Sequence, residues 1–125
     1  MALTPELIQG KLFSFYVAAQ KLHLDTRSYA EHKALGKLYE GLAGYVDELR
    51  ELLMGYQNGK RIGKGKIEEL PTYSSEAVSK LMEDGCNFAY ELYEWAGDKK
   101  YCDLENKAQE LSGLFAKTKY LLTLS

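Results

Sequence analysis

The chain has 125 residues, of which 46% are hydrophobic and 27% are charged, and its formal net charge is −2. This is the composition of an ordinary globular domain, and the near balance of charge gives no general attraction to nucleic acid or acidic membranes. No stretch approaches 18 uninterrupted apolar residues, and the first ten residues lack the pattern of a signal peptide. We therefore expect one soluble, cytoplasmic domain over residues 1–125 with no membrane partner.

The first predicted helix begins at Thr4 and ends near His23. Thr4 is a typical N-cap residue and Pro5 suits the first helical position, and apolar residues then recur at helical spacing. Residues 24–27 interrupt this pattern. We expect a turn there, which brings His23 and His32, the two histidines of the chain, to the corner between two helices.

The second predicted helix, residues 28–56, has two distinct faces. Ser28 and Glu31 have the spacing of a capping box, in which each side chain binds the other residue's amide. An apolar stripe with three- and four-residue spacing follows on one face. The opposite face carries glycines and carboxylates, and glycine within a helix often marks the close approach of another backbone. We infer a second buried face, filled by another copy of this helix: Gly36, Glu40, Ala43, Gly44, Asp47, Glu51 and Met54.

Residues 57–73 form a long connection. Asn58 and Gly59 give a turn signal, and further glycines keep the segment irregular. The stretch 67–70 is compatible with one helical turn before Pro71. A connection of this length joins helices that need not be nearest antiparallel neighbours, so we interpret it as a crossover.

Two more amphipathic helices complete the chain. The third begins at Ser74 or Ser75 and is closed by Gly97, and the fourth is capped by Asp98 and runs almost to the C terminus. Both repeat apolar residues every three or four positions. Four helices with matched apolar stripes and one long connection predict an all-α four-helix bundle with a crossover between the second and third helices.

The candidate metal ligands are on the first two helices. The inward Glu-x-x-His motif of di-iron bundles is absent, because Gln20 and Tyr29 stand three residues before the two histidines. An outward set of imidazoles and carboxylates remains, and these ligands suit Fe(II). Two other interpretations stay open, namely an exposed, solvated acidic pair and a histidine that caps a helix C terminus. The outward set is His23, His32, Asp47 and Glu51.

The segment LHLDTRSYAEHKALGKLYEGLAGYVDELRE resembles the helix A–B signature of the Dps-type miniferritins. The resemblance covers roughly residues 6–56 and implies a ferritin-like bundle with iron (Fe2+/Fe3+) as its cofactor. It implies a ferroxidase site across a two-fold interface, with His23 and His32 from one subunit and Asp47 and Glu51 from its partner. The expected function is Fe(II) oxidation for iron detoxification or storage. The expected assembly is a homo-oligomer through the glycine face, with a dimer as the minimum and a dodecamer as the larger alternative.

The sequence also departs from that family. His23 lies closer to His32 than is usual, so either the turn is shortened or Gln20 takes the place of the first ligand. The shorter chain and altered spacing support an alternative, a non-enzymatic bundle that serves as an oligomeric interaction module. The lysine-rich N-terminal tail that holds DNA in some members is missing, so we do not expect DNA binding. A basic loop is the remaining candidate for phosphate contact, although a solvated loop is the favoured interpretation: Lys60, Arg61, Lys64 and Lys66.

Overall fold

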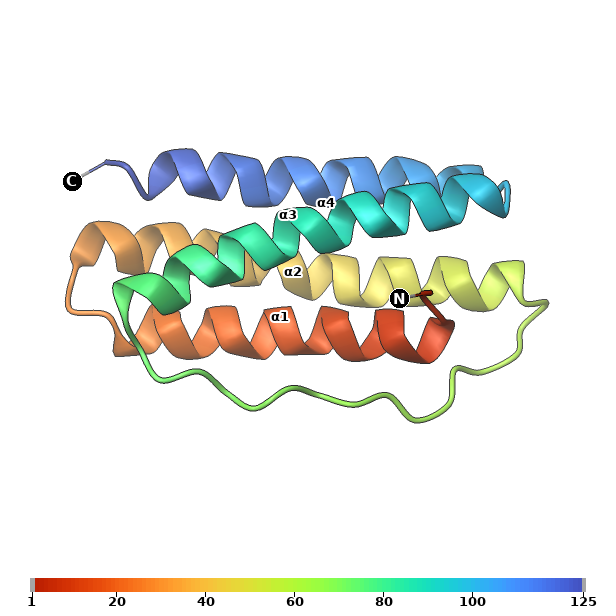
Figure 1. Cartoon of the computed structure of the whole chain (residues 1–125), viewed down its shortest axis with the longest axis horizontal. Helices are drawn as coiled ribbons and strands as arrows, with labels where there is room; N and C mark the ends of the chain where they lie inside the picture. Colours follow the sequence, from red (N-terminus) through yellow and green to blue (C-terminus); the bar gives the residue numbers. More distant parts are fainter. Residues whose placement is uncertain (1, 125) are drawn as a thin grey trace.

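The structure is a computed structural model that describes residues 2–124 and contains four helices (Figure 1). Helix α1 pairs with α2 as an antiparallel hairpin, and the connection 57–74 then runs back along the bundle. Helix α3 is therefore parallel to α2, and α4 returns antiparallel to α3. The prediction of an all-α four-helix bundle with a long crossover is confirmed. The helices are α1 (Pro5–Asp25), α2 (Tyr29–Tyr56), α3 (Ser75–Asp98) and α4 (Cys102–Leu121).

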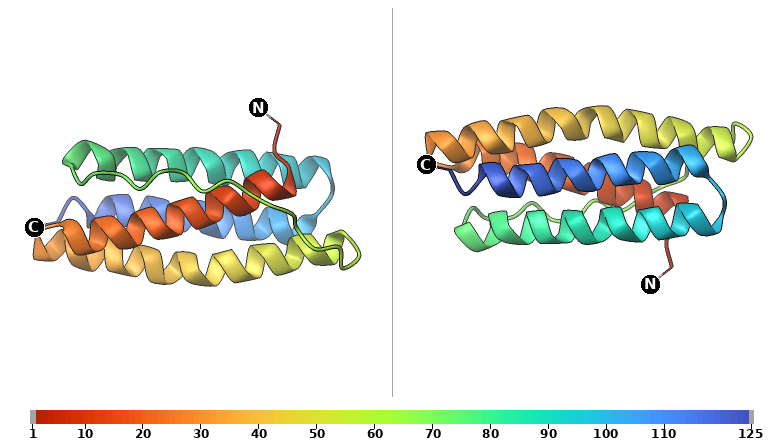
Figure 2. Two further views of the ribbon diagram at one scale, coloured as in Figure 1. Left: turned by 90° about the horizontal axis from the view of Figure 1, so that it is seen from below. Right: turned by 90° about the horizontal axis from the view of Figure 1, so that it is seen from above.

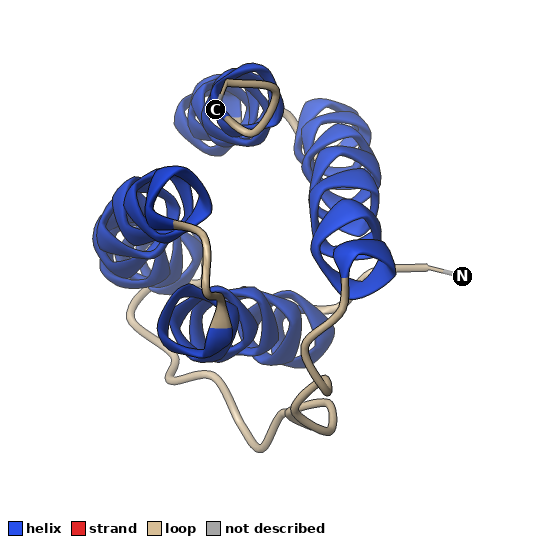
Figure 3. Cartoon of the chain, turned by 90° about the vertical axis from the view of Figure 1, so that its left-hand side faces the viewer, coloured by secondary structure: helices blue, strands red, loops and turns tan. Residues whose placement is uncertain are grey.

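Viewed along its axis, the bundle has one helix at each corner, and the connection lies outside them (Figure 3). Each helix packs against two neighbours: α1 on α2 and α3, and α4 on α2 and α3. Within residues 2–124, no helix has both the length and the apolar character needed to cross a membrane.

The apolar stripes predicted from the sequence form the core. Phe15, Phe88 and Phe115 meet at its centre, with the Phe15 ring centroid 5.5 Å from each of the other two. Gly85 makes room for this cluster, because a Cβ at that position would overlap the Phe115 ring. Residues on all four helices are fully or almost fully buried, including Ile8, Leu12, Ala19, Leu22, Leu35, Leu38, Leu42, Leu49, Val78, Leu81, Leu92, Leu104, Ala108 and Leu111.

Three helices begin with the predicted side-chain caps. The hydroxyls of Thr4, Ser28 and Ser74 each accept a hydrogen bond from the amide three residues later, at 3.2, 3.2 and 2.9 Å. These bonds satisfy amides that have no partner inside their helices. The return half of the capping box at Ser28 is wrong, because the Glu31 carboxylate instead accepts a hydrogen bond from the Tyr73 hydroxyl.

The junction between α3 and α4 differs from the sequence prediction. Helix α3 continues through Gly97 and Asp98, and the chain turns at Lys100, whose φ is 61°. Gly97 is therefore not a turn residue. It leaves room for the Glu105 side chain, because a Cβ there would lie 2.6 Å from Oε2 of Glu105.

Helix α4 has no side-chain cap of its own. Tyr101, the residue at its N-cap position, makes no such bond, and the predicted cap Asp98 is still inside α3. The hydroxyl of Tyr56, at the end of α2, accepts a 3.0 Å hydrogen bond from the amide of Asp103. A distant helix therefore supplies the group that satisfies the start of α4.

The crossover is extended and lies along α1 (Figure 2). The predicted turn at its start is confirmed, because Asn58 and Gly59 have φ values of 58° and 87°. The helical turn expected over residues 67–70 is wrong, since this stretch has no helical structure. The amide of Glu68 bonds to the Ser14 hydroxyl at 2.9 Å, and a connection that runs back along the bundle needs the reach of an extended chain.

Candidate functional site

The two histidines meet where α1 turns into α2. Only residues 26–28 separate the two helices. The rings of His23 and His32 stack with their centroids 3.9 Å apart and their planes inclined by 17°. The prediction that both imidazoles lie at this corner is confirmed. Gln20, the alternative first ligand, is exposed.

Each histidine forms a hydrogen bond to the backbone of the other. Nδ1 of His23 donates to the carbonyl oxygen of His32 at 2.7 Å, and Nδ1 of His32 donates to the carbonyl oxygen of His23 at 2.8 Å. Because a carbonyl can only accept, both Nδ1 atoms carry a proton. In each neutral ring the lone pair is therefore on Nε2, where it is available to a metal ion or a proton donor.

Gly36 allows the histidine pair to pack this closely. A Cβ at Gly36 would lie 2.9 Å from Cε1 of His23 and 3.1 Å from its Nδ1. The Tyr39 ring also packs against His23, and the centroids of the two rings are 5.1 Å apart. The prediction that Gly36 makes room for a second chain is therefore wrong, because His23 of the same chain occupies that space.

Two other glycines of α2, Gly41 and Gly44, differ in their surroundings. Gly41 faces Leu114 of α4, and a Cβ there would lie 2.9 Å from a Leu114 methyl group. Gly44 has no atom within 4 Å of such a Cβ. Of the glycines that suggested a second buried face, Gly44 is the one that lies open.

The two carboxylates of the candidate site lie elsewhere on α2. Asp47 and Glu51 are exposed, and Glu40 is exposed nearby. Asp47 follows His32 by fifteen residues, which places it roughly 22 Å farther along the helix axis. Within residues 2–124, no three His, Cys, Asp or Glu side chains are grouped so as to hold a metal ion. One chain therefore brings together the two histidines, and separately the two carboxylates.

The exposed side of α2 carries positive charge near its start and negative charge farther along, with Glu40 exposed between them. Lys33 and Lys37 are exposed in its first half, while Asp47 and Glu51 are exposed in its second half. These four residues lie within roughly 80° of one another around the helix. None of them forms an ion pair with another of the residues 2–124. The face thus carries unpaired charges of opposite sign at its two ends.

A family comparison covers most of this architecture. Residues 23–122, from the first histidine to the end of the bundle, match the model of a family described as a family of unknown function, DUF5856. The chain belongs to this family. It is also 26% identical over 116 residues to an uncharacterized 14.6 kDa protein in the mobD-ri intergenic region of Enterobacteria phage T4. That alignment covers 92% of this chain and 84% of the phage protein. No solved structure matches the chain significantly.

A tyrosine from the crossover bonds to the α1–α2 turn and to the start of α2 in this DUF5856 protein. The Tyr73 hydroxyl donates to Glu31 near the start of α2 and accepts a 3.4 Å hydrogen bond from Thr26. The bond to Glu31 raises the pKa of Tyr73 above its ordinary value, while the bond from Thr26 lowers it less. Sequence reasoning missed this contact, because no periodic signal connects residue 73 with residue 31.

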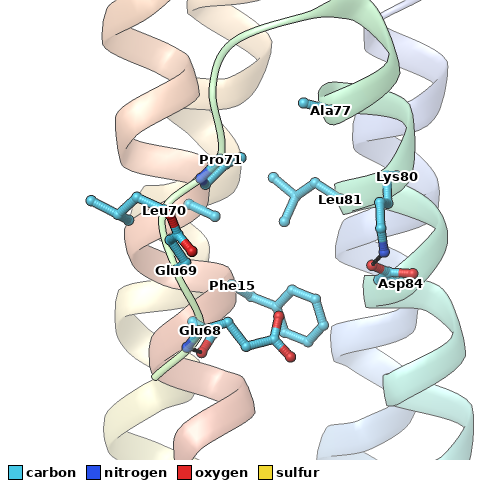
Figure 4. Close-up of a pocket in the computed structure, with 11 residues that line it drawn as sticks. Phe15, Glu68, Glu69, Leu70, Pro71, Ala77, Lys80, Leu81 and Asp84 are labelled. Carbon is cyan, nitrogen blue, oxygen red and sulfur yellow. Dashed lines mark hydrogen bonds and ion pairs between the residues drawn. The ribbon is translucent and has the colours of Figure 1, made fainter. Parts of the chain in front are cut away.

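A groove between α1 and α3 is one concave feature of this DUF5856 protein (Figure 4). Its cavity of about 190 Å³ has Phe15 at the floor and crossover residues along one edge. The Ser14 hydroxyl is committed to the Gly10 carbonyl and the Glu68 amide. Nζ of Lys80 is 2.6 Å from Asp84. Because these polar groups are already paired, we assign no chemistry to the groove.

Proposed function

We propose that two copies of the chain pair through the exposed face of α2 and bind Fe(II) between them. His23 and His32 of one copy and Asp47 and Glu51 of the other are the ligands, as in the Dps-type miniferritins that residues 6–56 resemble. The protein oxidises this Fe(II). The observation that supports the proposal best is the histidine pair, in which both Nδ1–H groups are bound to carbonyls and both Nε2 lone pairs remain. Histidines that hold a metal through one nitrogen commonly donate the other N–H in this way.

Within one chain the histidines and the carboxylates are too far apart along α2 to bind one metal ion. An antiparallel pairing of two α2 helices brings the histidines of one copy next to the carboxylates of the other. If residues whose numbers add to about 81 lie opposite each other, His32 of one copy faces the segment with Asp47 and Glu51 of the other. The two-fold axis then lies near Glu40 and Gly41.

The same register matches the charges of the two copies. It brings Lys33 and Lys37 near Asp47 and Glu51 of the second copy, so that these four charges become complementary, while the two Glu40 carboxylates lie near each other at the axis. The open Gly44 lies close to the axis and permits a close approach of the helices.

The residues of this chain have separate tasks in the proposed reaction. The histidine pair holds two neutral nitrogen donors in fixed orientations, and Asp47 and Glu51 offset the charge of the cation. These nitrogen and oxygen ligands suit Fe(II), the substrate. Each Fe(II) gives one electron to dioxygen or peroxide, which takes up protons from water as it is reduced. Cys86 and Cys102 are both free, which fits a reducing compartment, and we propose that the protein acts in the cytoplasm.

Iron oxidation by paired carboxylate variants tests the proposal. We expect the protein to accelerate the appearance of ferric absorbance, and the double variant Asp47→Asn, Glu51→Gln to lose this acceleration while it remains helical. The matched control is Glu83→Gln, Glu94→Gln, which removes two exposed carboxylates from α3 and should oxidise iron normally. Light scattering on the same samples should show a dimer or a larger particle. A strict monomer, or equal activity in both double variants, contradicts the proposal.

The histidine geometry also favours a second function. The reciprocal hydrogen bonds and the ring stacking are sufficient to lock the α1–α2 corner without a metal. The chain is then a non-enzymatic, oligomeric interaction module that uses the same face of α2. Calorimetric titration with Fe(II) and Zn(II) separates the two functions. Binding that is lost in His23→Ala supports the iron protein, and absence of binding at micromolar protein supports the module.

A further inference from the structure

The crossover carries a concentration of positive charge. Four of the sixteen basic residues fall within seven positions, and no Asp or Glu occurs between Leu52 and Ile67. The rest of the chain has twelve basic and eighteen acidic residues, so positive charge is segregated into this segment. We call it the basic strip, and it consists of Lys60, Arg61, Lys64 and Lys66.

The backbone of the basic strip is fixed on α1. The side-chain amide of Gln9 donates to the carbonyl of Gly63 at 2.9 Å, and Arg50 in turn donates to the Gln9 oxygen at 3.1 Å. A Cβ on Gly65 would lie 2.5 Å from the carbonyl oxygen of Glu6 and 3.2 Å from the amide nitrogen of Gly10, so the two backbones are in direct contact. The four charges therefore lie on a segment whose backbone is fixed along one side of the bundle (Figure 2).

The side chains of the basic strip point to solvent and keep their charges available. All four residues are exposed, and none forms an ion pair with another part of residues 2–124. Arg61 donates one hydrogen bond, at 2.6 Å, to the carbonyl of Gly59. Of the neighbouring acids, Glu68 is paired with Lys11 at 3.2 Å, and the aliphatic part of Glu6 lies beside Gly63.

We propose that the basic strip binds the phosphate backbone of double-stranded nucleic acid without reading its sequence. An extended segment from residue 60 to residue 66 spans at most roughly 20 Å, which matches about six phosphates along one strand of B-form DNA at 3.4 Å each. The stretch Lys60–Lys66 contains no aromatic residue to stack on an unpaired base and no helix to enter a groove. Lysine and arginine side chains on a fixed backbone suit contacts with successive phosphates.

The salt dependence of binding tests this inference. We expect the full chain to bind a fluorescent 20-base-pair duplex weakly, with a slope of log affinity against log salt of about −3 to −4, because four phosphates are neutralised. Affinity should fall about a hundredfold between 50 and 200 mM salt. The variant Lys60→Gln, Arg61→Gln, Lys64→Gln, Lys66→Gln should lose this binding and keep the helical content of the parent.

The matched control removes four positive charges elsewhere. It neutralises Arg27, Lys80, Lys117 and Lys119, which are exposed on other parts of the bundle, and should retain most of the affinity and the slope. Equal loss in both variants would mean that net charge alone is responsible, which overturns the inference. Binding to vesicles with anionic lipids but not to the duplex would overturn it as well. The experiment needs no iron, so its result is independent of the proposed iron site.

Discussion

The backbone of α1 at Gly10 lies directly against the backbone of the crossover at Lys66. A Cβ on Gly10 would overlap the carbonyl oxygen of Lys66, and Gly65 is equally close to α1 from the other side. Ser14, one turn later, bonds its hydroxyl to the Gly10 carbonyl at 2.7 Å and receives the amide of Glu68. Two glycines and one serine therefore fix the path of the long connection, because they let an extended strand touch a helix without intervening side chains.

Replacing Gly10 should therefore destabilise the protein. We expect Gly10→Ala to lower the free energy of unfolding by about 1–3 kcal/mol, because the added methyl group meets backbone that cannot rotate away. Chemical denaturation followed by circular dichroism measures this change. The control is Gly113→Ala in α4, where an added Cβ meets no atom within 4 Å. This substitution should stabilise the helix by about 0.5–1 kcal/mol. Two variants of equal stability would show that the contact is not tight.

The sequence was sufficient for the helices because their signals are local. The three- and four-residue spacing of buried residues such as Leu42 and Leu111 predicts both the helices and their inward faces. The turn between His23 and His32 was predicted from a break in the same spacing. The end of α3 was misplaced because Gly97 looks like a helix terminator, whereas its lack of a side chain serves Glu105 on the next helix. The sequence alone does not distinguish a glycine that makes room for packing from a glycine that ends a helix.

The candidate site was predictable only in part. The stacking of His23 and His32 depends on Gly36, and no pattern in the sequence connects this glycine with a histidine thirteen positions earlier. The contact of Tyr73 with Glu31 joins residues forty-two positions apart, through a crossover whose path has no periodic signal. Side-chain contacts between distant segments require the three-dimensional path of the chain, which local spacing does not contain.

The hydroxyl of Tyr56 should be important for the start of α4. We expect Tyr56→Phe to lower the Tm by a few degrees, because the amide of Asp103 loses its partner while the stacking of the ring on Tyr101, at 4.2 Å, remains. Thermal unfolding followed by circular dichroism measures the change. Tyr120→Phe, which removes a hydroxyl from an exposed ring, is the control and should leave Tm unchanged. Similar Tm values for both variants would exclude a capping role.

The contact between Tyr73 and Glu31 should make the protein less stable at high pH. The hydrogen bond to Glu31 raises the pKa of Tyr73 in the folded state above the unfolded value of 10.0. The folded state therefore holds this proton more tightly, so the stabilisation is complete below pH 10 and is lost as the pH rises through the folded pKa. Urea denaturation between pH 8 and about pH 11 should show a smaller loss of stability in Tyr73→Phe than in the parent. An identical loss in the variant would contradict this cause.

Charge exchange on α2 should test how two copies of the chain pair. In the proposed antiparallel register, Lys33 and Lys37 lie near Asp47 and Glu51 of the second copy. We expect Lys33→Glu, Lys37→Glu to weaken the dimer by about tenfold or more, because like charges then face each other across the pair. Adding Asp47→Lys, Glu51→Lys to the same chain should restore the dimer, since the four exchanged residues again face charges of opposite sign. Light scattering at several concentrations measures both effects, and a fourfold variant that stays dissociated would rule out this register while leaving other interfaces open to test.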